Sequence, residues 1–173
     1  MGIDLVHRTL KLAAAQFGER VPAGGEPGDR EQALARDCAA AVGEYRSHLR
    51  SVEFRKAVQA LRRLWTLGNH YLEDRAPWNL IRQDREAGAM VLRTALNLVR
   101  MFALAAEPIL PFSAQRVFDA LELTPAERKV PLQRCVDLSA LAPGRRFQLI
   151  PPLFRRMDAA EVERLKAQFG GRN

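Results

Sequence analysis

The sequence predicts an all-α fold: an antiparallel bundle of four to five helices, then an irregular segment and a final short helix. Apolar residues recur every three to four positions over most of residues 1–121, which is the period of an amphipathic helix. Prolines and glycine-rich stretches break this period where helices would end. With 173 residues, 47% of them hydrophobic, the chain can bury one core. We therefore expect one domain over residues 1–173, with the bundle in 1–121, an irregular connector in 122–157 and a last helix in 158–169.

The first two helices are predicted from stripes of apolar side chains. The first helix has Val6, Leu10, Ala13 and Phe17 on one face, and the second has Leu34, Cys38, Ala41, Val42, Tyr45 and Leu49. Gly18 and Pro22 should end the first helix. Residues 22–29 (PAGGEPGD) have the composition of a loop, and Asp29 is expected to cap the second helix.

Ser51 is expected to cap a third helix that runs to about Asp74. Its predicted buried side consists of Phe54, Ala57, Val58, Leu61, Leu64, Trp65, Gly68 and Leu72. A proline pushes the residue before it out of the helical region, so Pro77 predicts a turn or kink over residues 75–78. Trp65 lies on the apolar stripe and is expected in the core.

A fourth helix, a shorter helix and a terminal helix should follow. The inward residues of the fourth are Val91, Leu92, Ala95, Leu98, Val99, Phe102 and Ala106. Pro108 and Pro111 should end it, after which Ser113 is expected to cap a short helix. Asp158, with a glutamate three residues later, resembles a capping box and predicts the start of the terminal helix.

The residues point to no catalytic, cofactor or metal site. Neither a G-x-G-x-x-G stretch nor a P-loop is present. Cys38 and Cys135 form no C-x-x-C pair, which argues against a structural zinc site and a disulfide framework and favours a reducing cytoplasm. The three histidines are too far apart in sequence for a metal triad. No signal-like N-terminus and no run of ~20 apolar residues is apparent, so no membrane contact is expected.

Two features indicate a binding surface, each with a plainer alternative. The surplus of 27 Lys and Arg over 20 Asp and Glu favours an anionic partner or simply aids solubility. A polar stripe on the first helix, made of Asp4, His7, Arg8 and Lys11, is either a binding face or a solvated face with an Asp4–Arg8 pair. Trp78, next to Pro77, is either a stacking platform for an unpaired base or a plug at the end of the core.

Residues 69–78 (NHYLEDRAPW) resemble the N-x-Y-(hydrophobic)-[DE]-x-x-A-P-W signature of methionyl-tRNA synthetases. Residues 5–10 (LVHRTL), 107–111 (EPILP) and 152–158 (PLFRRMD) also match, so that the resemblance spans nearly the whole chain. It implies the helical anticodon-binding domain of a class I synthetase, which reads the CAU anticodon of tRNA(Met). The expected partners are the anticodon loop and the catalytic domain of a parent synthetase.

The resemblance also assigns roles to residues. It implies that Trp78 stacks on the first anticodon base, that Pro77 fixes its approach, and that Arg8 contacts base and backbone. Lys11 is expected at phosphates, together with Arg75 and Arg82. Asp4 stands where the family has an asparagine. A carboxylate accepts hydrogen bonds but does not donate them. Such an acceptor would still favour the amine of cytosine over the carbonyl of uracil.

In the family, a separate nucleotide-fold domain joins methionine to ATP and then to tRNA. Its H-x-G-H and K-M-S-K-S-like motifs do not occur here, so this chain is expected to catalyse nothing alone, whereas a parent protein would be a methionine–tRNA ligase. The chain is either a piece of such a protein or a free-standing relative. The competing hypothesis is a scaffold or protein-interaction domain that kept the fold but lost RNA readout, which Asp4 and the missing catalytic half suggest.

Overall fold

The structure, a computed structural model, describes residues 3–154 and 157–170, with side chains from Leu5 onward. Within these ranges the secondary structure is helical, and the only bridge between extended segments joins Arg20 to Arg146. The predicted all-α class is therefore confirmed.

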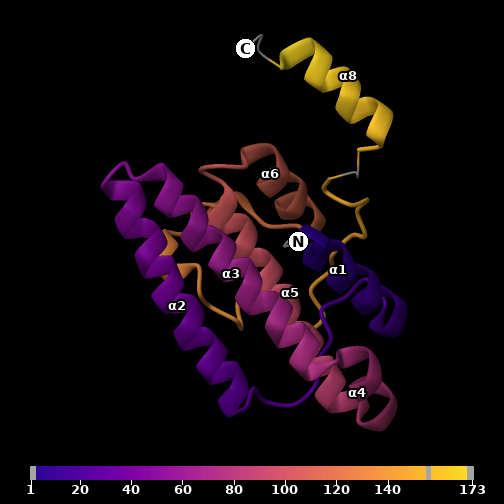
Figure 1. Cartoon of the computed structure of the whole chain (residues 1–173). Coiled ribbons are helices and arrows are strands. Elements are labelled where there is room, and N and C mark those ends of the chain that lie inside the picture. Colours follow the sequence, from indigo (N-terminus) through magenta and orange to yellow (C-terminus); the bar gives the residue numbers. More distant parts are fainter. Residues whose placement is uncertain (1–2, 155–156, 171–173) are drawn as a thin grey trace.

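Three long helices form the body of the bundle (Figure 1): α2 (Asp29–Arg50), α3 (Phe54–Arg75) and α5 (Arg85–Ala106). Helices α2 and α3 make an antiparallel hairpin that packs against α5, and the shorter α1 (Ile3–Phe17) lies on the other side of α5. The buried stripes expected for α1, α2 and α5 form one continuous core.

Helix α5 is the central helix of the bundle. By length and composition alone it is long and apolar enough to cross a membrane. However, 94% of its apolar window is buried inside the protein, as expected for a core helix that is surrounded by other helices.

Several predicted helix ends are shifted. Asp29 lies in the first turn of α2 and Gly28 caps it, whereas Ser51 ends α2 and Glu53 precedes α3. Phe54 is 61% exposed and Val58 is also exposed, whereas Ala57 between them is buried, so only part of the start of the predicted α3 stripe is buried. Phe54 and Val58 lie close to the turn that joins α2 and α3 (Figure 1).

Two prolines start helices that sequence analysis placed differently. Pro77 is the first residue of α4 (Pro77–Gln83), where only a turn or kink was expected. Pro111 is the first residue of α6 (Pro111–Ala120) rather than a terminator alone, and Ser113 lies inside that helix instead of capping it. The first helical position needs no N–H, and the fixed φ of proline suits it, which accounts for both.

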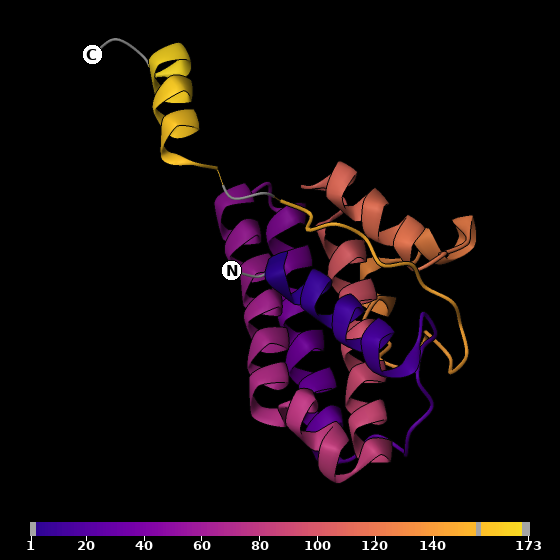
Figure 2. The same cartoon turned by 90° about the vertical axis from the view of Figure 1, so that its right-hand side faces the viewer.

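The segment after α6 is better ordered than predicted. It contains α7 (Pro125–Arg128), which Thr124 caps, and the 3₁₀ turn η1 (Leu132–Arg134). Inside the bundle, the Asn97 amide oxygen accepts the Leu141 N–H at 2.7 Å. The chain then runs alongside α1, and the last helix α8 (Ala159–Phe169) begins at the predicted Asp158 cap and stands apart from the bundle (Figure 2).

Candidate nucleic-acid interface

Trp78 and Arg8 are neighbours on the surface. The guanidinium carbon of Arg8 lies over the indole ring of Trp78, 5.7 Å from its centroid. Trp78 is 38% exposed, and Arg8 is exposed as well. An arginine within about 6 Å of an indole face makes a cation–π contact, which holds both groups in place without hiding them from solvent.

Pro77 and the residue before it set the position of the Trp78 indole. Helix α3 ends at Ala76, which has the left-handed φ of 39° and donates its N–H to the Leu72 carbonyl at 2.9 Å. Helix α4 starts directly afterwards with the buried Pro77, so that Trp78 is the second residue of a helix. The sequence predicts only a turn or kink over residues 75–78, whereas the structure has a helix that begins at Pro77. The chain changes direction between α3 and α4 (Figure 1), and Trp78 lies against Arg8 of α1.

A buried carboxylate fixes the end of α3 that carries this turn. Glu31 is only 4% exposed; its Oε1 accepts the Tyr71 hydroxyl at 2.8 Å, and its Oε2 accepts the Gly28 N–H at 2.9 Å. Burial, and then the bond to Glu31, raise the pKa of Tyr71 well above its usual value. The motif tyrosine thus ties α3 to the start of α2.

Arg75 belongs to this buried cluster. Its Nε lies 3.4 Å from Glu31 Oε1, an ion pair without the alignment of a hydrogen bond. Arg75 thus has a structural contact in addition to its predicted role at a phosphate, and Arg82 is exposed on α4.

A groove runs between α1 and α4 beside Trp78. Its lining residues are Arg8, Thr9, Lys11, Leu12, Ala15, Leu72, Pro77, Trp78 and Leu92, and its volume is about 360 Å³. The floor is apolar, and the exposed Lys11 lies on its rim. An apolar floor with cations at the edge suits a flat aromatic base attached to a charged backbone.

Sequence reasoning missed the floor of this groove. Leu12 and Ala15 lie one turn after Arg8 and Lys11 on the same side of α1, so helical spacing could have indicated them. Leu72 and Leu92 fit the apolar stripes of α3 and α5, so the sequence predicts them as core residues. They line the groove only because α1 packs against these two helices, which a local pattern cannot show.

Two polar residues of α1 have other positions than expected. The His7 ring shares a hydrogen bond with the Ile150 carbonyl at 3.0 Å, so it anchors the C-terminal segment instead of belonging to a free solvated face. The side chain of Asp4 lies outside the described residues, which leaves its role in readout a prediction. No grouping of metal-binding side chains occurs in the part of the chain that the structure describes.

Comparison with known proteins identifies the family. Residues 21–173 match the family described as the anticodon binding domain of methionyl tRNA ligase. The chain belongs to this family. The family match begins after α1, but similarity to individual ligases extends over α1 as well.

Two curated relatives illustrate the similarity. The chain is 44% identical over 168 residues to methionine–tRNA ligase 1 of Acaryochloris marina and 37% identical over 169 residues to methionine–tRNA ligase of Streptomyces avermitilis. Each alignment covers 97% of this chain but only 30% and 29% of the relative, respectively. This anticodon-binding domain therefore spans less than a third of the length of those proteins.

Solved structures agree with the sequence comparison. The free form of Mycobacterium tuberculosis methionyl-tRNA synthetase superimposes with a TM-score of 0.78 at 25% identity, over 90% of this chain and 31% of that one. The same enzyme in complex with methionyl-adenylate gives 0.72 at 26% identity, over 88% and 30%. The helical arrangement is thus that of the corresponding part of a synthetase.

Proposed function

We propose that this domain binds the anticodon loop of tRNA(Met) and reads its CAU anticodon. The observation that carries the proposal is the exposed Trp78 indole, fixed by Pro77 and contacted by Arg8, at the edge of an apolar groove. An unpaired base would stack on the indole, the Arg8 guanidinium would bond to a base edge or phosphate, and Lys11 would contact the backbone. We propose a cytoplasmic location, which suits two buried free cysteines.

The proposal extends to a longer protein. In a methionine–tRNA ligase similar to the relatives above, this domain would position the tRNA while a separate catalytic domain used ATP to attach methionine. The described residues of this chain supply a docking surface for RNA and not the reacting groups.

Replacing Trp78 tests the proposal. Binding of a CAU anticodon stem-loop should weaken by about 1–3 kcal/mol, or roughly five- to 150-fold, in Trp78→Ala, since one base loses its stacking surface. Trp65→Phe is the matched control, because Trp65 packs partly buried against the core and lines no part of this groove. Circular dichroism should show that both variants stay folded.

Anticodon dependence separates RNA reading from a scaffold role. The unaltered domain should prefer the CAU stem-loop over a UAU stem-loop. Equal affinity for both, with no loss in Trp78→Ala, would remove the proposal and favour a scaffold that keeps the fold only. For Asp4, the substitution Asp4→Asn should change the ratio of the two affinities, and an unchanged ratio would exclude this residue from readout.

A further inference from the structure

Two arginines face each other where the segment after α1 meets the segment before α8. Arg20 and Arg146 are bridge partners in an antiparallel pairing. The flanking bonds run from the Val21 N–H to the Arg145 carbonyl at 2.8 Å and from the Phe147 N–H to the Glu19 carbonyl at 3.1 Å. This pattern makes the arginines a non-hydrogen-bonded pair, the kind whose side chains come closest together.

Nothing in the described part of the chain neutralises this pair. Both arginines are exposed, and neither forms an ion pair with a described carboxylate, whereas the adjacent Arg145 is held by Glu127. Successive side chains of an extended segment alternate in direction, so Glu19 points away from Arg20, and its carboxylate instead accepts the Leu149 N–H at 3.4 Å. Like charges directly opposite each other destabilise a pairing. An anion between the two guanidinium groups would reverse that effect.

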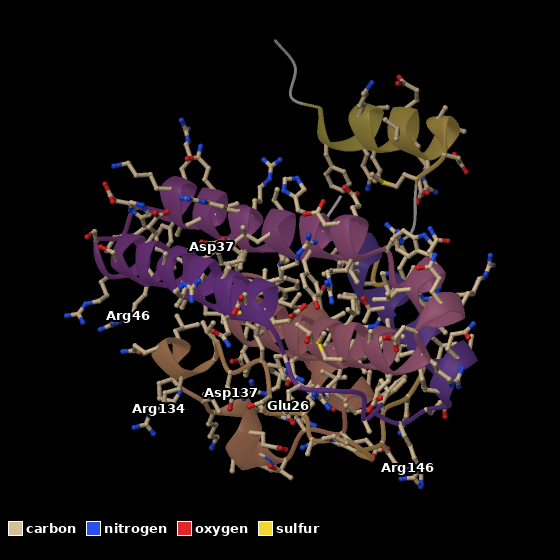
Figure 3. All side chains as sticks on the ribbon, turned by 90° about the horizontal axis from the view of Figure 1, so that it is seen from below. Glu26, Asp37, Arg46, Arg134, Asp137 and Arg146 are labelled. Atoms are coloured by element: carbon tan, nitrogen blue, oxygen red, sulfur yellow. The ribbon has the colours of Figure 1, made fainter. Side chains whose placement is uncertain are left out.

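One of the two guanidinium groups is already positioned. The Arg20 Nη1 donates to the Gly144 carbonyl at 2.9 Å, which orients this side chain across the pairing. Arg146 is labelled in Figure 3, where its side chain points outward from the body of the protein. Two guanidinium groups on directly paired residues can match the several oxygens of a phosphate better than single scattered cations do.

The arginine pair lies beyond the C-terminal end of α1, on the chain that continues from the groove. From Arg8 to Phe17 the helix rises about 13 Å, and the three further residues to Arg20 add at most ~10 Å, so the pair is within about 24 Å of Arg8. Between them, Arg85 covers the Phe17 ring at 4.5 Å and donates to the Gln16 carbonyl at 2.6 Å. Figure 2 shows the segment before α8 passing this end of α1.

We propose that Arg20 and Arg146 together bind a backbone phosphate of the tRNA whose anticodon occupies the groove at Trp78. This inference rests on the proposed function and adds a second contact point to it. A phosphate contact at this distance sets the orientation of the RNA and contributes affinity that depends on salt but not on the anticodon sequence.

The test compares two double variants with the same change in charge. Arg20→Gln with Arg146→Gln removes the proposed site, and Arg55→Gln with Arg62→Gln removes two exposed arginines of α3, outside the groove and the bridge. Affinities for CAU and UAU anticodon stem-loops are measured at several salt concentrations. Thermal unfolding of the first variant should be nearly unchanged, because the substitution removes a repulsive pair together with one exposed hydrogen bond from Arg20 to Gly144.

Loss of the site should weaken binding of both stem-loops by the same factor, about three- to tenfold, and should leave the CAU preference intact. The slope of log affinity against log salt should fall in magnitude by about 1, as expected for one lost phosphate contact, whereas the control variant keeps the original slope. Affinity and slope equal to those of the unaltered domain would overturn the phosphate site while leaving the CAU preference, and with it the proposed function, intact. Absence of any CAU preference in the unaltered domain would instead overturn the proposed function.

Discussion

Removing the Tyr71 hydroxyl should show how much the end of α3 depends on the buried Glu31. The substitution Tyr71→Phe deletes the 2.8 Å bond to Oε1 and leaves that oxygen with the unaligned Arg75 contact at 3.4 Å. A hydrogen bond to a charged group contributes about 1.5–3 kcal/mol, and here the acceptor is 4% exposed, so water cannot readily replace the lost donor. The free energy of unfolding should fall by that amount, which lowers the thermal midpoint by about 3–12 °C for a chain of this length.

The chain offers a matched control in Tyr45. Its hydroxyl is also buried, but it has no hydrogen-bond partner among the described residues, and burial raises its pKa to about 12. Tyr45→Phe should therefore leave the midpoint unchanged or raise it slightly. Differential scanning calorimetry of both variants checks the reasoning, and equal losses of stability would refute it, because only one of the two hydroxyls has a partner.

Three further predictions concern stability and reactivity. Arg145 holds the pKa of Glu127 at about 2, below its usual 4.5, so this pair stabilises the fold above about pH 5 and should lose that contribution as pH falls toward 2. The difference in thermal midpoint between the unaltered domain and Glu127→Gln should therefore shrink as the pH is lowered from about 5 to about 2. Burial raises the pKa of Cys38 to about 12 and of Cys135 to about 11. Neither thiol should therefore react with a disulfide reagent at pH 8 until denaturant is added, and rapid labelling of the folded domain would contradict this. Gly24→Ala should lower stability by about 2 kcal/mol or more in urea unfolding, because φ is +70° and a Cβ would lie 2.3 Å from a backbone nitrogen of α5.

The sequence predicted the fold class and most helices because their apolar stripes are long and regular. It misplaced helix ends where the same residue can either end one helix or begin the next. A proline such as Pro77 both ends one helix and suits the first turn of the next, and the α4 helix that follows is too short to show a period. The capping box that opens at Thr124 was a readable signal for α7 that periodicity alone did not reveal.

The candidate site was predictable in part. The motif around Pro77 and Trp78 indicated the stacking ring, and the polar stripe on α1 indicated Arg8. Their juxtaposition, and the arginine pair of the Arg20–Arg146 bridge, depend on contacts between segments up to 126 residues apart, which no local pattern contains. Arg75 looked like a free cation for the same reason, since its buried partner Glu31 lies on another helix.

The emission of the Trp78 indole tests most directly whether a base stacks on it. In a Trp65→Phe variant, Trp78 is the only indole, since the chain has two tryptophans. Titration with a CAU anticodon stem-loop should quench its fluorescence to saturation, at the same RNA concentrations at which an independent assay detects binding. Binding detected by that assay with unchanged emission from Trp78 would contradict the account of this surface as the place where the anticodon is read.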